Sequence, residues 1–74
     1  MMYQIIIRTA SNEYVEQHYG LIESLNRMLE IAKCDNVEII DCMCCATGEI
    51  MVTIEWEVVT YVATETIERF YEEM

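Results

Sequence analysis

Cysteines are the residues of this 74-residue chain whose chemistry stands out first. Cys42, Cys44 and Cys45 lie close together, and Cys34 precedes them. Thiolates at short spacing can bind zinc or an iron–sulfur cluster. In a strand, however, Cys42 and Cys44 point to one side and Cys45 to the other, so the three sulfur atoms do not converge. We therefore expect packed strand residues with no metal and no cofactor, and Cys45 as the reactive thiol. A thiol or metal-binding module that uses Cys42, Cys44 and Cys45 is the alternative.

Few other residues could catalyse a reaction. His18 is the only histidine, and the sequence fixes no acid or thiol beside it. Glu55 and Glu57 share one face of an expected strand, an arrangement that could bind a cation but is more typical of a solvated face. Two glycines cannot form a glycine-rich phosphate loop. The sequence favours a protein that is not an enzyme.

A hairpin is the clearest element that positions these residues. Residues 37–45 and 50–58 read as strands on either side of Ala46-Thr47-Gly48-Glu49. A bulged turn with Gly48 in the left-handed region would pair Cys45 with Glu49 and keep Asp41 out of the core, which favours it over a two-residue turn. That register predicts one face made of Ile40, Cys42, Cys44, Ile50, Val52, Ile54 and Trp56, and an opposite face with Asp41, Thr53 and Glu55.

The second strand of this hairpin is expected to continue through residues 58–62, past the end of its partner. Those residues would need another strand, from the N-terminus or from another chain.

Residues 21–33 predict a helix, with Glu23 and Arg27 paired on its solvent side and an apolar stripe of Leu21, Ile22, Leu25, Met28, Leu29 and Ala32. Residues 13–19 can be read as a strand or as part of a longer helix; strand-forming residues favour the strand. In the strand reading, Ile5 and Ile7 face Val15 and Tyr19, and Arg8 lies opposite Glu16. Residues 64–74 predict a last helix that begins at a Thr64 cap and has Ile67, Phe70, Tyr71 and Met74 on one stripe.

The elements add up to one domain, residues 1–74, of the α+β class. We expect a small antiparallel sheet of three or four strands with one or two helices on one face. The expected order is β-β-α-β-β-α; the alternative order, with residues 13–19 helical, is β-α-β-β-α.

Composition limits the partners. Fourteen acidic residues against four basic ones give a net charge of −10, which argues against direct binding to nucleic acid or to an anionic membrane. A hydrophobic content of 54% argues against a disordered acidic tail. No segment reads as a signal sequence or a membrane span, so we expect a cytoplasmic protein with reduced thiols. A domain this small often gains stability from a partner, and a homodimer is one possibility.

The sheet face away from the helix is the expected interaction surface. It mixes apolar and acidic residues, as protein interfaces do, and its expected site residues are Asp41, Glu55, Glu57, Met43, Met51 and Tyr61. A basic nucleic-acid-binding protein would fit it, with carboxylates mimicking phosphates and inhibition as the result. The alternative, that acidic residues serve only solubility, stays open. The turn Ala46-Thr47-Gly48-Glu49 resembles hairpins of small phage and mobile-element accessory proteins, a resemblance that also implies an inhibitor.

Overall fold

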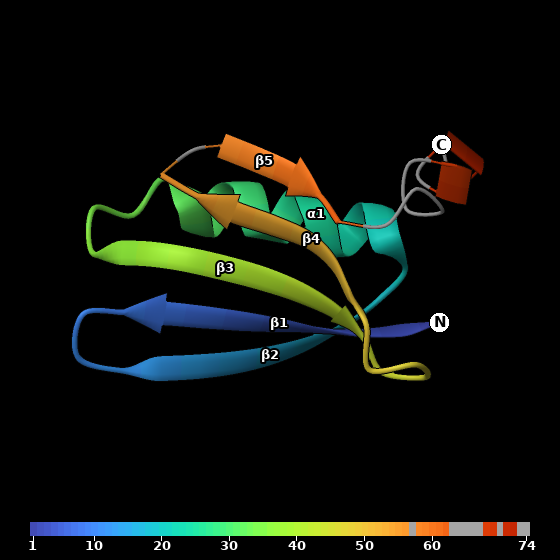
Figure 1. Ribbon diagram of the computed structural model, residues 1–74, viewed down its shortest axis with the longest axis horizontal. Coiled ribbons are helices and arrows are strands. Elements are labelled where there is room, and N and C mark those ends of the chain that lie inside the picture. Colours follow the sequence, from blue (N-terminus) through green and yellow to red (C-terminus); the bar gives the residue numbers. More distant parts are fainter. Residues whose placement is uncertain (57, 63–67, 70, 73–74) are drawn as a thin grey trace.

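Five antiparallel strands and one helix make up the fold in a computed structural model of the chain, which describes residues 1–56, 58–62, 68–69 and 71–72. The elements in chain order are β1 (Met2–Thr9), β2 (Glu13–Tyr19), α1 (Leu21–Ala32), β3 (Val37–Cys44), β4 (Ile50–Glu55) and β5 (Val58–Tyr61). The strands form one sheet in the order β2-β1-β3-β4-β5 (Figure 1). The expected α+β class is confirmed, but the sheet has five strands, more than expected.

The order β-β-α-β-β at the start of the chain is confirmed, and the alternative with a helix over residues 13–19 is wrong. The fifth strand was not expected. The predicted last helix over residues 64–74 falls largely outside the described residues, although residues 68–69 and 71–72 are helical. In the described part of the chain, no helix is long and apolar enough to cross a membrane.

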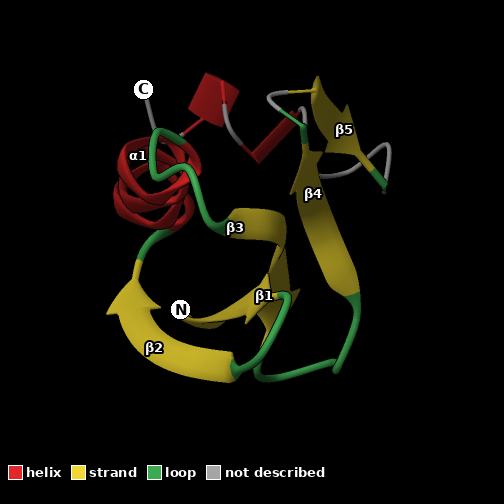
Figure 2. Cartoon of the chain, turned by 90° about the vertical axis from the view of Figure 1, so that its left-hand side faces the viewer, coloured by secondary structure: helices red, strands yellow, loops and turns green. Residues whose placement is uncertain are grey.

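Helix α1 covers one face of the sheet, which Figure 2 shows from the side. It begins after Gly20, which has a φ of 81° that favours glycine, and it packs on β1, β2 and β3. Its buried residues meet the inward side chains of the strands in a single core. That core contains Tyr3, Ile5, Ile7, Leu21, Leu25, Met28, Ile31, Ile40, Cys42, Cys44, Met51, Val52 and Ile54.

The register between β3 and β4 follows the prediction over residues 39–42: Ile39 lies opposite Glu55, and Cys42 lies opposite Val52. It then shifts by one residue, because Met43 lies opposite Ile50. Gly48 has the expected left-handed conformation, with a φ of 74°.

The register shift is a β-bulge, which places one extra residue in β4. It turns Met51 into the core, where the residue is only 1% exposed, and leaves Ile50 half-buried opposite Met43. The predicted faces of Ile50 and Met51 are therefore exchanged. The same shift brings the Glu49 carbonyl oxygen to the Cys44 amide, at 2.9 Å, where Cys45 was expected to pair.

The strand predicted to continue past residue 58 instead reverses. Trp56 follows the last residue of β4, has a φ of 52° and is 74% exposed. The prediction that it shares the core face of Ile54 is therefore wrong. β5 then pairs antiparallel with β4, with Val59 opposite Ile54 and Tyr61 opposite Val52. The strand that residues 58–61 were expected to need is β4 itself.

The exchange of Ile50 and Met51 can be tested by truncating each side chain. We expect Met51→Ala to lower the free energy of unfolding by about 2–5 kcal/mol, because it leaves a cavity in the core. Ile50→Ala should cost about 1 kcal/mol, since that side chain is only partly buried. Urea unfolding of the two variants measures both values. The reverse ranking would mean that the strands pair without the bulge.

Candidate functional site

The sheet face opposite α1, called here the open face, is not covered by any helix or strand among the described residues. Side chains directly opposite one another in neighbouring strands lie on the same face, so the pairing of the strands defines rows across the sheet. The first row, the charged row, contains Glu13, Arg8, Ile39, Glu55 and Val58.

The remaining rows of the open face are called here the neutral rows. The first of them contains Val15, Ile6, Asp41, Thr53 and Thr60. The next contains Gln17, Gln4, Met43 and Ile50, and the last contains Tyr19 and Met2.

Asp41 lies on the open face as predicted, but its carboxylate is satisfied within the molecule. Thr53 donates a hydrogen bond to it at 2.7 Å, and the Arg8 guanidinium lies 3.3 Å away. Arg8 also binds Glu13 at 3.0 Å. Because Asp41 is only 8% exposed, it stabilises the sheet and does not offer its charge to a partner.

The other predicted site residues separate into three groups. Glu55 is exposed on the open face, and Met43 is half-buried there. Met51 and Tyr61 are not on this face: Met51 is in the core, and Tyr61 shares the helix-facing side with Val52 because the chain reverses at Trp56. Glu57 lies outside the described residues. Sequence reasoning missed Glu13 and Arg8, which join the charged row because β2 pairs with β1 in an unexpected register.

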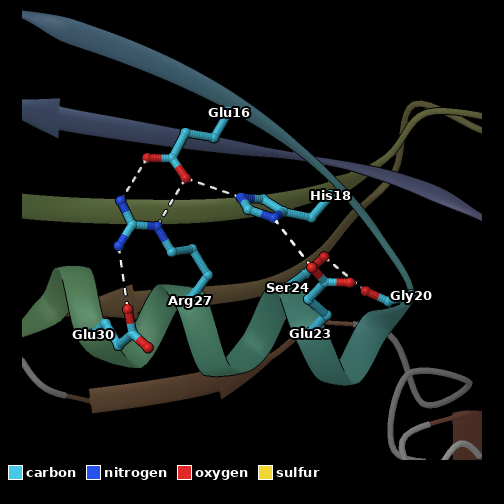
Figure 3. A network of polar contacts seen from close by, with 7 residues as sticks. All are labelled: Glu16, His18, Gly20, Glu23, Ser24, Arg27 and Glu30. Carbon is cyan, nitrogen blue, oxygen red and sulfur yellow. Dashed lines mark hydrogen bonds and ion pairs between the residues drawn. The ribbon is translucent and has the colours of Figure 1, made fainter.

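A polar network between β2 and α1 is the second feature with possible chemistry (Figure 3). Arg27 donates two hydrogen bonds to Glu16, at 2.9 and 3.0 Å, and a third to Glu30 at 3.3 Å. His18 Nε2 lies 2.9 Å from the same Glu16 carboxylate, and its Nδ1 lies 3.9 Å from Glu23.

Two sequence expectations change with this network. Arg8 lies opposite Glu13 rather than Glu16, because the chain reverses at residues 10–11, where the Thr9 amide donates a hydrogen bond to the Asn12 carbonyl oxygen, and not at residues 11–13. Arg27 binds Glu16 from another element instead of its helix neighbour Glu23. Pairing across elements leaves no periodic signal in the sequence, so no local pattern could have revealed it.

The network is better suited to structure than to proton transfer. Hydrogen bonds from Arg27 and His18 lower the pKa of Glu16 to about 2. A carboxylate with so low a pKa is a weak base near neutral pH. Glu16 also raises the pKa of Arg27, so the ion pair persists over a wide pH range. These contacts tie the edge strand β2 to α1.

The cysteines divide by burial. Cys42 and Cys44 are buried, whereas Cys34 and Cys45 are exposed, and all four are free thiols. Burial raises the pKa of Cys42 to about 12. Burial also opposes ionisation of Cys44, but hydrogen bonds from Thr47 and from the backbone outweigh it and lower the pKa of that thiol. Within the described residues, no three histidine, cysteine or acidic side chains are grouped to hold a metal ion.

A groove of about 340 Å³ is lined by residues from the end of α1, the start of β3 and the end of β4. Ala32, Lys33, Ile54 and Trp56 line part of it. It does not join the open face, because Ile54 points to the helix side.

Comparison of the chain with family models, curated proteins and solved structures finds no match. The fold and surface therefore define only a class, a small acidic α+β domain whose sheet is covered on one face.

The Glu16 ion pair predicts a specific pH dependence of stability. The pKa of Glu16 falls from 4.5 to about 2 on folding, so its contribution is fully present above pH 4.5 and is lost as the pH falls towards 2. We expect Glu16→Gln to be less stable than the parent at pH 7, with the difference shrinking through that window. Thermal unfolding from pH 7 to pH 2 measures it. Glu23→Gln, whose side chain is 67% exposed, is the control, and a difference that does not change with pH would contradict the assignment.

The burial of the thiols predicts their reactivity. We expect Cys34 and Cys45 to react rapidly with a thiol reagent in the folded protein, and Cys42 and Cys44 to react only on unfolding. Titration in buffer and in denaturant counts the two sets. Rapid reaction of a third thiol in buffer would revive the reading of Cys42, Cys44 and Cys45 as a working thiol site.

Proposed function

We propose that this protein is a non-enzymatic interaction module that binds a basic protein through the charged row of its open face. The single observation that supports the proposal is the one-sided cover of the sheet. Helix α1 packs on one face, and the other face presents carboxylates beside half-buried apolar side chains. Such a mixture is typical of a protein interface.

The charged row lies at one end of the strands, on the left in Figure 1. Glu13 and Glu55 stand at either side of Arg8 and Ile39 in this row. The row has two carboxylates and one guanidinium, so its net charge is negative. The guanidinium of Arg8 is already paired with Glu13 and Asp41. Glu38, beside Ile39 in sequence, adds an exposed carboxylate near this end.

A partner for this end needs lysine or arginine side chains and an apolar contact for Ile39 and Val58. A nucleic-acid-binding protein has such a surface. Carboxylates in the charged row would then occupy the positions of phosphates, and the module would inhibit the partner. The resemblance of the Ala46–Glu49 turn to hairpins of phage and mobile-element accessory proteins agrees with an inhibitor. Glu57 extends the same acidic sequence beyond Glu55.

The alternative, a thiol or metal-binding module, has less support. Two of its three cysteines are buried, and the raised pKa of Cys42 keeps that thiol protonated near neutral pH. One equivalent of zinc per chain in the purified protein would favour it.

Affinity capture at low and high salt tests the proposal. We expect the protein to retain a basic protein at low salt and to release it as the salt screens the charges. In the double variant Glu13→Gln with Glu55→Gln, capture should fall on the order of tenfold or more, which corresponds to about 1.4 kcal/mol. Mass spectrometry of the captured proteins measures the loss.

The matched control removes the same charge from α1. Glu23→Gln with Glu30→Gln changes two carboxylates whose side chains are 67% and 68% exposed, on the helix rather than on the open face. Equal capture by the parent and the Glu13/Glu55 variant would leave solubility as the role of these acids. An equal loss in both double variants would point to net charge instead of a site.

A further inference from the structure

We infer that the neutral rows of the open face bind a second copy of this chain. The inference uses a different part of the open face from the charged row, so it does not rest on the proposed function. It starts from the contrast between these rows and the rest of the surface.

The neutral rows offer no free carboxylate. Asp41 is their only acidic residue, and it is buried and bound by Arg8 and Thr53. Around it lie the half-buried side chains of Ile6, Met43 and Gln4. Elsewhere, exposed glutamates stand on α1, at the start of β3 and in the β3–β4 turn, as Glu23, Glu30, Glu38 and Glu49. A surface shaped only by solubility would carry such charges on the neutral rows as well.

The charge of the chain restricts the surface through which a second copy can bind to rows without free carboxylates. Two molecules with a net charge of −10 repel each other wherever their carboxylates meet. The neutral rows allow contact without apposed carboxylates. A two-fold axis that lies between the sheets and runs perpendicular to the strands places the two charged rows at opposite ends of the dimer. Both charged rows then stay at the rim, open to another partner.

The size of the face fits a weak dimer. The molecule measures 34 × 21 × 17 Å, and Figure 1 looks down its shortest axis onto the sheet. The product of the two longer dimensions is about 700 Å², which is of the same order as the roughly 800 Å² that each partner contributes to a standard interface. Because the neutral rows are only part of the open face, we expect dissociation in the micromolar range.

Introducing carboxylates into the neutral rows tests the inference. Gln4 and Gln17 lie opposite each other in β1 and β2, and neither is in the core, so Gln4→Glu with Gln17→Glu should fold. We expect the parent to be a dimer at about 100 μM. In the double variant, the dissociation constant should rise on the order of tenfold or more, because the added charges of two copies are brought together. Sedimentation over a range of concentrations measures both constants.

The control adds the same two charges away from the open face. Asn26→Glu with Asn36→Glu changes two exposed amides, one on α1 and one in the connection to β3. This variant should keep the parent's dissociation constant, and circular dichroism checks that both variants are folded. A monomeric parent at about 100 μM, or an equal effect of the two double variants, overturns the inference.

These outcomes separate the two proposals. A monomer that still captures a basic protein overturns the dimer and leaves the charged row standing. A dimer that captures no basic protein overturns the proposed function and supports the dimer.

Discussion

The alternation of side chains along β3 is the constraint on which the rest of the structure depends. This strand pairs with both β1 and β4, and it sends Ile40, Cys42 and Cys44 into the core while Ile39, Asp41 and Met43 face the other way. A slip of one residue would exchange the two sets and push a carboxylate towards the core. The positions of α1, of the charged row and of the neutral rows all follow from this register.

Asp41 shows how a charged residue can occupy the middle of a sheet. The two strands on either side of β3 supply its contacts, since Arg8 comes from β1 and Thr53 from β4. Leaving such a group unpaired would cost more than its pair contributes. The pairing also removes the charge from the surface, so an acid that the sequence predicts as a site residue makes its face more neutral. Residues of one type on one face can thus serve opposite purposes: Asp41 is satisfied internally, whereas Glu55 is exposed.

Periodic elements could be predicted from the sequence, and departures from periodicity could not. The stripe of Leu21, Leu25 and Met28 marks α1, and the alternation around Cys42 fixes most of the β3–β4 register. The bulge at Met51 has no glycine, and the reversal at Trp56 has neither glycine nor proline, so the usual signals for such irregularities are missing. Those two irregularities account for the misplaced Met51 and Tyr61. The contact of Arg27 with Glu16 depends on how α1 lies on β2, which only the packed structure defines.

Trp56 gives the molecule an optical property of its own. It is the single tryptophan of the chain, and it stands at the tip of the β4–β5 hairpin, away from the core. Its indole is already wet in the folded state, so its emission reports the surroundings of the hairpin and responds weakly to loss of the core. Intrinsic fluorescence will therefore change little when this protein unfolds. A molecule that binds over the hairpin will shift the emission to shorter wavelengths.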